Sequence, residues 1–200
     1  MTPPSRRLIL GSTSRYRREL LERLRLPFDV LAPEVDETPQ PGEAPQALAL
    51  RLARAKAEDV ARRQPQAVVI GSDQVADLDG EPLGKPLTHE RALAQLRRMR
   101  GRTVVFETAV AVVCAASGFA HSELARVRVR FRSEADGLDD AAIERYLRAE
   151  TPYDCAGSAK SEGLGIALLE AIDSDDPTAL VGLPLIRTCR LLRAAGLQLP

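Results

Sequence analysis

Hydrophobic side chains recur along this chain with two different periods, which predict helices and strands in mixed order. A period of three to four residues is typical of helices with one buried face. Helices are predicted at about 14–26, 45–63, 88–100, 139–149 and 184–195. Short apolar runs and period-two alternation predict strands at 8–10, 28–31, 67–70, 103–115, 124–132 and about 166–169. This order indicates an α/β fold with a mixed sheet.

Arginine occupies every second position along the predicted strand 124–132. Arg126, Arg128, Arg130 and Arg132 alternate with Val127, Val129 and Phe131. A row of arginines could serve nucleic-acid binding, but period two favours the solvated face of an antiparallel strand. We therefore expect no nucleic-acid partner.

The composition is that of an ordinary globular protein. The chain has 200 residues, of which 44% are hydrophobic and 28% charged, and its formal net charge is zero. This length suits one domain, residues 1–200. Zero net charge favours neither nucleic acid nor an anionic membrane as partner. No apolar run approaches the ~18 residues of a membrane span and a secretory segment is not apparent, so we expect a cytoplasmic protein.

The cysteines and histidines favour structural roles. Cys114, Cys155 and Cys189 are odd in number, far apart and without a Cys-x-x-Cys pair. A disulfide framework or a zinc site is therefore not expected. His89 and His121 lie in polar stretches, and we assign neither a catalytic role.

Lysine is scarce in this sequence. The 28 basic residues comprise 25 arginines and three lysines, Lys56, Lys85 and Lys160. Because arginine supplies nearly every other positive charge, a remaining lysine indicates a need for a compact, rotatable ammonium group. Chance survival is the alternative.

Segment 11–18 has the features of an anion site. A predicted strand leads through Gly-Ser-Thr-Ser to a helix N-terminus, with Ser14 as its N-cap, where free backbone N–H groups attract anions. Arg17 lies in the first helical turn, an unfavourable place for a cation that a bound phosphate would explain. Arg18 can pair with Glu22 at i, i+4. The spacing is not that of a P-loop, and a helix start with solvated arginines is the alternative.

Acidic residues follow two of the predicted strands. The acidic segment 34–37 comes after one strand, and Asp73 comes after the buried run 67–70. Because ligands of α/β proteins bind at the carboxyl edge of the sheet, we expect Asp73 beyond its strand at that edge. Hard oxygen ligands from the two segments could hold Mg²⁺ or Mn²⁺.

Two further segments carry charged residues among glycine, proline or other small residues. Gly84 permits close approach and Pro86 stiffens the turn around Lys85. Small residues fill segment 155–166 and would hold Lys160 and Glu162 against a group that approaches the backbone closely. Each segment alone could be a mobile loop.

Together these segments resemble the Maf family, which is named for septum formation and known as nucleotide pyrophosphatases. The resemblance extends over about residues 8–192, with the motifs in the family's order. It rests on Leu-Ile-Leu-Gly-Ser-Thr-Ser at 8–14 with Arg17 and Arg18, and on segments 33–37, 51–57, 71–75, 84–86 and 181–185. No single motif is decisive, whereas their combination is highly specific.

The resemblance implies an elongated α/β domain with a strongly bent mixed sheet and a cleft between two lobes. The implied reaction converts a nucleoside triphosphate to its monophosphate and pyrophosphate. Asp73 matches the family's general base, and Glu37 and Asp73 match its ligands for a divalent cation, Mg²⁺, Mn²⁺ or Co²⁺. Ser12, Arg17, Lys56 and Lys85 match its phosphate-contacting positions. The four negative charges of a triphosphate suit such a cluster of cations and metal.

The motifs also resemble one branch of the family, which acts on 7-methyl-GTP. Gly-Ser-Asp-Gln at 71–74 and the glycine-rich segment 156–166 carry this resemblance. Tyr16, Gln74 and Glu162 match the positions associated with substrate choice. An aromatic face favours the cationic methylated base, and a carboxylate can accept hydrogen bonds from guanine. The sequence departs from the branch where Tyr16 replaces tryptophan, Ala159 and Leu164 replace phenylalanines, and Arg15 replaces proline.

Three functional hypotheses follow. The first is a 7-methyl-GTP pyrophosphatase, and the second is a pyrophosphatase for dTTP, UTP or another modified nucleotide. The third is a non-catalytic nucleotide-sensing module linked to division or septum formation, which intact acids at Glu37 and Asp73 disfavour. The missing P-loop disfavours a phosphotransferase. A homodimer, and the role of Lys160, are left open.

Overall fold

One mixed sheet forms the centre of the molecule. The computed structural model describes residues 6–199, and within this range the sheet has seven strands. They are β1 (Leu8–Leu10), β2 (Asp29–Val30), β3 (Val68–Leu78), β4 (Glu81–Leu83), β5 (Thr103–Cys114), β6 (Phe119–Phe131) and β7 (Leu169–Asp173). The predicted α/β class is confirmed.

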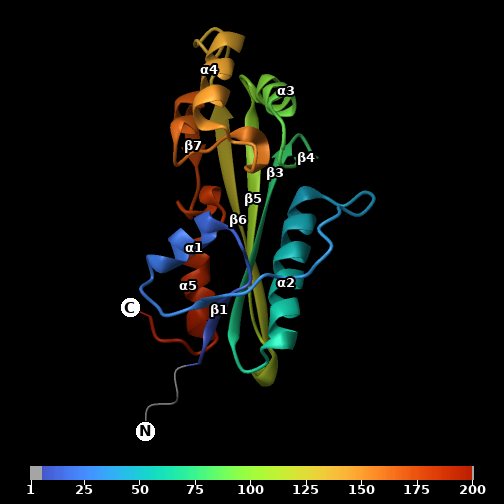
Figure 1. Cartoon of the computed structure of the whole chain (residues 1–200), viewed down its shortest axis with the longest axis vertical. Helices are drawn as coiled ribbons and strands as arrows, with labels where there is room; N and C mark the ends of the chain where they lie inside the picture. The colour runs from blue at the N-terminus through green and yellow to red at the C-terminus, as the bar shows by residue number, and fades with distance from the viewer. Residues whose placement is uncertain (1–5, 200) are drawn as a thin grey trace.

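The sheet combines a short parallel part with long antiparallel strands. Its order is β2-β1-β3-β5-β6-β7, and β4 pairs with β3. β1 runs parallel to β2 and β3, whereas the remaining pairs are antiparallel. The long strands β5 and β6 run along the elongated molecule (Figure 1).

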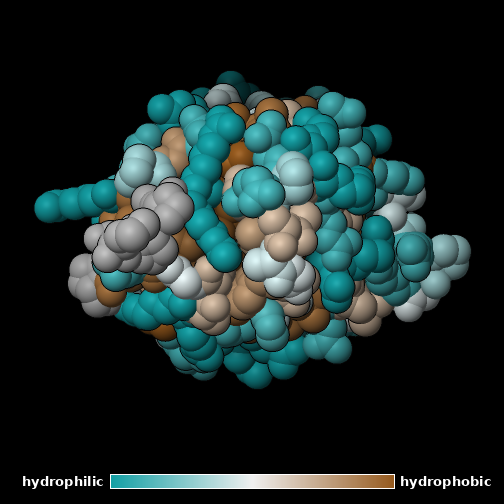
Figure 2. Space-filling view, turned by 90° about the horizontal axis from the view of Figure 1, so that it is seen from below, coloured by the Kyte–Doolittle hydropathy of each residue, from teal (hydrophilic) through white to brown (hydrophobic). Residues whose placement is uncertain are grey.

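Five helices cover the sheet within the described residues. They are α1 (Arg15–Glu22), α2 (Pro45–Arg63), α3 (His89–Met99), α4 (Asp140–Glu150) and α5 (Leu185–Ala194). α2 lies along one side of the long strands and α5 with α1 on the other, while α3 and α4 lie toward one end (Figure 1). Viewed from the opposite end, the surface is mostly hydrophilic with smaller hydrophobic areas between the polar side chains (Figure 2).

Side chains alternate between the two faces of β3. Val69 and Val75 pack with residues of α2, whereas Val68 and Ile70 pack with residues of α1 and α5. This alternation follows from the period of two along a strand. Consecutive residues farther along β3, Asp73 and Gln74, therefore point to opposite faces of the sheet.

Local sequence signals define several boundaries correctly. α2 begins at Pro45, a favourable first helical position because proline lacks an N–H. Ser14 accepts a hydrogen bond as the predicted N-cap of α1, and Thr88, where a helix was predicted to begin, caps α3 in the same way. The arginines of β6 are exposed while its valines are buried, as predicted. A tight turn at 79–80 joins β3 to β4.

Other boundaries differ from the prediction. α1 ends at Glu22 rather than near 26, because the chain turns and Arg25 adopts a positive φ of 54°. Segment 164–168, where a strand was expected to begin, forms a 3₁₀-helix, and β7 starts only at Leu169. β6 begins at Phe119 rather than 124, because β5 pairs with it back to the turn.

The chain contains no helix that is both long and apolar enough to span a membrane, as far as residues 6–199 are concerned.

Candidate functional site

Asp73 lies within a strand and not in a loop beyond it. β3 continues past the predicted run 67–70 to Leu78 because β5 pairs with it over nearly its whole length. β1, however, pairs only with residues 68–70, and β4 pairs with β3 only from Ala76 onward. Among the described strands, none pairs with residues 71–75 on that side. Asp73 thus lies just beyond the carboxyl end of β1, on an open edge of β3.

A buried lysine joins two acidic residues at this edge. The Lys56 Nζ lies 2.7 Å from the Asp73 Oδ1 and 2.9 Å from the Glu37 Oε1. Lys56 and Asp73 are 4% and 7% exposed, whereas the Glu37 side chain is 59% exposed. Burial removes much of the solvent screening, so the Lys56–Asp73 pair is a strongly coupled one. The pair borders solvent on the side where the exposed Glu37 lies.

Gly71 brings the helix that carries Lys56 close to the strand. A Cβ on Gly71 would lie 2.3 Å from the Ala53 carbonyl oxygen and 2.6 Å from the Ala57 nitrogen, both in α2. Any side chain here would push α2 away from β3. The glycine before Asp73 is therefore part of what places Lys56 against the carboxylate.

Arg17 and Ser12, which match phosphate-contacting positions of the family, lie beside this cluster. The Arg17 Nη1 donates to the Ser12 Oγ at 3.3 Å, and its Nε donates to the Gly182 carbonyl at 3.0 Å. Burial lowers the pKa of Arg17, while the carboxylates of Asp73 and Glu37 raise it. An arginine remains protonated under such conditions.

Lys85 forms no hydrogen bond or ion pair with this cluster. It is exposed and makes no hydrogen bond or ion pair with the described residues. It follows β4, which runs antiparallel to β3 with Leu83 opposite Ala76. The chain therefore leaves β4 in the direction of Asp73, toward the open edge.

Gln74 points to the opposite face, where it binds backbone rather than open solvent. Its Nε2 lies 2.9 Å from the Thr108 Oγ1 and 3.0 Å from the carbonyl oxygens of both Ala179 and Leu180. The Thr108 hydroxyl also donates to the Ala179 carbonyl at 3.0 Å. The side chain of Gln74 is thus already oriented by the 179–180 backbone.

Sequence reasoning missed several of these partners. Ser72, whose hydroxyl lies 2.9 Å from the Gly182 carbonyl oxygen, and Thr108 were given no role. Both are fully buried. Each is a hydroxyl residue beside an apolar run of its strand, and this was the signal that could have identified them. The carbonyl of Gly182 has no such signal, because every residue carries one.

Tyr16 lies beside two cations. The Arg15 guanidinium carbon is 4.7 Å from the Tyr16 ring centroid, and the Lys160 Nζ is 5.9 Å from it. The Arg15 Nη2 also donates to the Tyr16 hydroxyl at 2.6 Å. Burial is the main cause of the raised pKa of Tyr16. Glu162 is exposed, and among the described residues no contact links it directly with Tyr16 or Gln74.

The glycine-rich segment is held by α4. The Glu150 carboxylate binds the Lys160 Nζ at 2.6 Å and the Leu164 N–H at 2.8 Å. A Cβ on Gly163 would lie 2.6 Å from a Glu150 oxygen, and one on Gly165 would lie 2.5 Å from the Lys160 carbonyl. The close approach predicted from the small residues is therefore real, and the approaching groups are Glu150 and the segment's own backbone.

The acidic pair offers a partial ligand set for a divalent cation. Glu37 and Asp73 present carboxylate oxygens to the same nitrogen atom, and such oxygens suit Mg²⁺ or Mn²⁺. Within residues 6–199, no group of three Asp, Glu, His or Cys side chains is arranged to hold a metal ion. The remaining ligands would have to be water and phosphate oxygens, as is usual for Mg²⁺.

A cavity of about 760 Å³ lies elsewhere, beside the start of α2 and the β3–β4 turn. Glu107 and Arg126 line it, whereas Lys56 and Asp73 do not. The open edge of β3, not this cavity, carries the chemistry described above.

Comparison with known families identifies the chain. The family described as "Maf-like protein" matches residues 7–195. The chain belongs to the Maf family. The resemblance expected from the motifs is thereby confirmed over nearly the whole length.

Relatives within the Maf family are similar along the entire chain. A protein from Polaromonas sp. named "7-methyl-GTP pyrophosphatase" is 73% identical, covering 100% of this chain and 89% of its own. Proteins of the same name from Albidiferax ferrireducens and Bordetella pertussis are 67% and 60% identical, each covering 98% of this chain. The matches cover 96% and 94% of these two relatives' own lengths.

Proposed function

We propose that this chain hydrolyses a nucleoside triphosphate, preferentially 7-methyl-GTP, to the monophosphate and pyrophosphate. The observation that carries the proposal is the Lys56 ammonium between Asp73 and Glu37 at the open edge of β3, with Arg17 nearby. Four separate segments supply these residues. The names of the relatives, at 60–73% identity, support the substrate.

The positive residues suit the phosphate chain. Arg17 and Lys56 are already oriented by neighbouring groups, so little reorganisation would be needed when a phosphate binds. Ser12 lies on the same loop before α1 and can donate a hydrogen bond to a phosphate oxygen. Lys85, extended from the β4 edge, would reach the phosphates from the other side as a flexible point charge.

Asp73 suits the role of general base. Its carboxylate accepts a proton from water as the water oxygen bonds to the α-phosphorus and the bond to the pyrophosphate oxygen breaks. The Lys56 ammonium donates to the Asp73 Oδ1 at 2.7 Å and so fixes the orientation of the carboxylate. Glu37 and Asp73 would hold a divalent cation, Mg²⁺, Mn²⁺ or Co²⁺. When bound, this cation supplies positive charge to neutralise the phosphates.

The nucleotide would cross the sheet at the open edge of β3. Asp73 and Gln74 point to opposite faces, so phosphates beside Asp73 and a base toward Gln74 require a ligand that passes this edge. Tyr16, Gln74 and Glu162 would then select the base. Residues 1–200 would act as one catalytic domain.

A second candidate is a pyrophosphatase with less preference for the methylated base. The observation that favours it is the pair of cations beside Tyr16, because Arg15 and Lys160 would repel a cationic base. Such an enzyme would prefer dTTP, UTP or another modified nucleotide. A non-catalytic nucleotide-sensing module is the third possibility.

A substrate panel tests the proposal. 7-methyl-GTP, GTP, dTTP and UTP are compared under one metal with pyrophosphate release monitored, in wild type and Asp73→Asn. We expect the highest kcat/KM for 7-methyl-GTP and a loss of roughly 10²-fold or more in Asp73→Asn, the scale of a positioned base. Asp77→Asn, the same change four residues along β3, is the control and should keep near wild-type turnover.

Each alternative has its own result in this panel. Higher activity on dTTP or UTP would reject the 7-methyl-GTP assignment but keep the reaction. Near wild-type turnover in Asp73→Asn would reject the catalytic role of that residue. No turnover of any nucleotide with Mg²⁺, Mn²⁺ or Co²⁺ would favour the sensing module.

A further inference from the structure

The 179–182 segment connects the phosphate end of the proposed site with its base end. The Gly182 carbonyl accepts from the Arg17 Nε at 3.0 Å, and the carbonyls of Ala179 and Leu180 lie 3.0 Å from the Gln74 Nε2. Three backbone carbonyls of one short turn therefore orient both Arg17, proposed for the phosphate end, and Gln74, proposed for the base end. If this turn moves, both residues lose their orientation.

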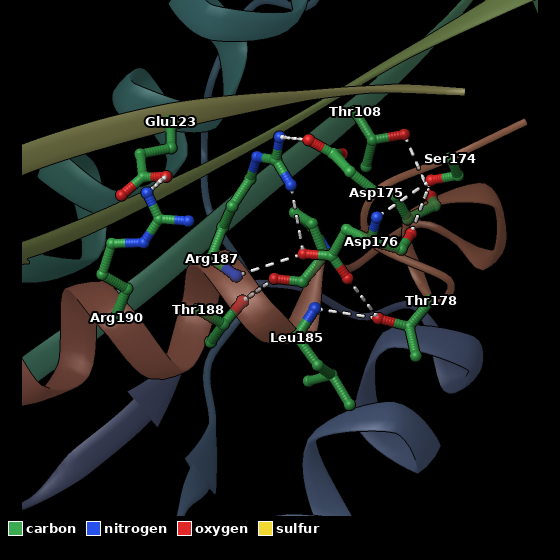
Figure 3. Close-up of polar contacts among 12 residues, drawn as sticks. Thr108, Glu123, Ser174, Asp175, Asp176, Thr178, Leu185, Arg187, Thr188 and Arg190 are labelled. Atoms are coloured by element: carbon green, nitrogen blue, oxygen red, sulfur yellow. Dashed lines mark hydrogen bonds and ion pairs between the residues drawn. The ribbon is translucent and has the colours of Figure 1, made fainter. Parts of the chain in front are cut away.

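Asp176 lies at the start of this turn and is completely buried. It is 0% exposed, and its Oδ2 accepts the backbone N–H of Arg187 at 3.1 Å. The Arg187 Nη1 lies 3.5 Å from the same oxygen, and the close-up shows the two side chains facing each other (Figure 3). A buried carboxylate without such partners would cost several kcal/mol.

The bond to the Arg187 N–H caps α5 from outside the helix. Pro184, the N-cap of α5, makes no side-chain capping bond. Asp176 accepts from the third residue of the helix, as an N-cap side chain would, and its charge lies at the positive end of the helix dipole. The turn that carries the three carbonyls is thus fastened to α5 at this point.

Thr178 closes the turn on itself. Its Oγ1 accepts the Leu185 N–H at 2.8 Å, donates to the Leu183 carbonyl at 2.8 Å, and lies 3.2 Å from the Asp176 Oδ1 (Figure 3). One hydroxyl therefore holds the residues on both sides of the 179–182 segment together. Removing the carboxylate or the hydroxyl would release it.

Arg187 connects this assembly to the sheet. Its Nε donates to the Leu124 carbonyl of β6 at 3.0 Å, and its Nη2 pairs with Asp175 at 3.0 Å. The turn is thereby fixed to both α5 and β6. We infer that Asp176, with Thr178, is a positioning residue that orients Arg17 and Gln74 through the 179–182 carbonyls.

This inference rests on the proposed function, since it assigns Arg17 and Gln74 to the two ends of the substrate. Asp176→Asn keeps the size of the side chain but removes the charge, and one amide cannot accept from all three partners. We expect kcat/KM for 7-methyl-GTP to fall about 10- to 100-fold, the scale of lost positioning. The melting temperature should fall as well, because a buried bond is lost.

Two further variants separate positioning from stability. Val104→Ala removes buried methyl groups at the far end of β5 and should lower the melting temperature while leaving kcat/KM unchanged. Thr178→Val replaces the hydroxyl with a methyl group of similar size and should lower kcat/KM, whereas Thr178→Ser keeps the hydroxyl and should retain the wild-type kcat/KM. The Thr178 pair also provides the test if Asp176→Asn fails to fold.

Binding of 7-methyl-GTP is measured calorimetrically beside turnover, so the two proposals can fail separately. Wild type that binds the nucleotide without hydrolysing it would reject the reaction, while weaker binding in Asp176→Asn and Thr178→Val would still support positioning. Variants with wild-type kcat/KM and affinity would overturn the positioning role. Wild type that binds no nucleotide would overturn both.

Discussion

Tyr16 is the residue on which the proposed preference for a methylated base depends. Its ring lies 4.7 Å from the Arg15 guanidinium and 5.9 Å from the Lys160 ammonium. A cationic base that stacks on this ring must compete with Arg15, because both interact with the same aromatic quadrupole. The strength of the preference is therefore a balance between the two contacts.

Substitutions at Tyr16 measure this balance. An aromatic–cation contact contributes ~0.5–2 kcal/mol, so Tyr16→Ala should reduce the ratio of kcat/KM for 7-methyl-GTP over GTP by roughly three- to thirtyfold. Tyr16→Phe keeps the ring and should retain the ratio. Arg15→Ala removes the competing cation and should increase it. An unchanged kcat/KM ratio in Tyr16→Ala would show that the ring packs against neighbouring residues and does not select the methylated base.

Glu162 should behave differently from Tyr16. In the proposed site, Glu162→Gln removes acceptor charge that would face the N1–H and N2 amino groups, which GTP and 7-methyl-GTP share. We expect it to lower kcat/KM for both nucleotides to a similar extent in the same assay. Loss for 7-methyl-GTP alone would contradict this role.

Single residues were predictable where their chemistry is unusual for the chain. Lysine scarcity marked Lys56 and Lys160, and both lie in ion pairs. It also marked Lys85, which is exposed and makes no hydrogen bond or ion pair with the described residues, so scarcity alone did not define its place. Contacts to backbone carbonyls, such as that of Gly182, depend on the tertiary arrangement and have no signature in the sequence.

At the scale of elements, the packing of α2 against β3 determines where Lys56 lies. The strand was predicted at 67–70 only, because the continuous apolar run stops before Gly71. The strand continues since β5 pairs with the residues after this run, and tertiary pairing outweighs local propensity. The helix boundaries of α2, in contrast, follow from proline at its start and its apolar period.

Gly71→Ala tests this packing. The added Cβ would meet backbone atoms of Ala53 and Ala57 at 2.3 and 2.6 Å, and backbone cannot rotate away as a side chain can. We expect a loss of at least about 1–3 kcal/mol in the free energy of unfolding, measured with urea, and reduced turnover as Lys56 moves. Gly84→Ala is the matched control, since nothing lies within 4 Å of its Cβ position. Equal stability of the two variants would contradict close packing at Gly71.

At the scale of the whole molecule, residues assigned to one substrate come from distant parts of the fold. Lys56 lies on α2, Arg17 on α1, and Lys160 in a segment held by α4. The order of motifs predicted the family and the fold class, because each element keeps its local pattern. It did not predict that Glu150 holds Lys160, since the two are brought together only by the folded segment.

The Glu150–Lys160 pair predicts a pH dependence of stability. The Lys160 hydrogen bond is the largest cause of the lowered pKa of Glu150, followed by the Leu164 N–H. A carboxyl whose pKa is lower in the folded state stabilises it fully above the ordinary value of 4.5, and this contribution is lost as pH falls through the folded pKa. Glu150→Gln should therefore unfold at lower urea concentration than wild type at pH 7. The difference between the two proteins should shrink below about pH 4.5.

Glu150→Gln also distinguishes effects on the base end of the proposed site from effects on its phosphate end. Freeing Lys160 beside Tyr16 should raise KM for 7-methyl-GTP in Glu150→Gln, whereas kcat should change little because Asp73 and Lys56 lie on another part of the fold. Glu58→Gln breaks only the exposed i, i+4 pair with Arg54 on α2, so its effect on stability should be small at every pH. A stability difference for Glu150→Gln that stays constant from pH 7 to acid would show that this carboxyl is not linked to folding. A fall in kcat without a rise in KM would show that α4 acts on the phosphate end.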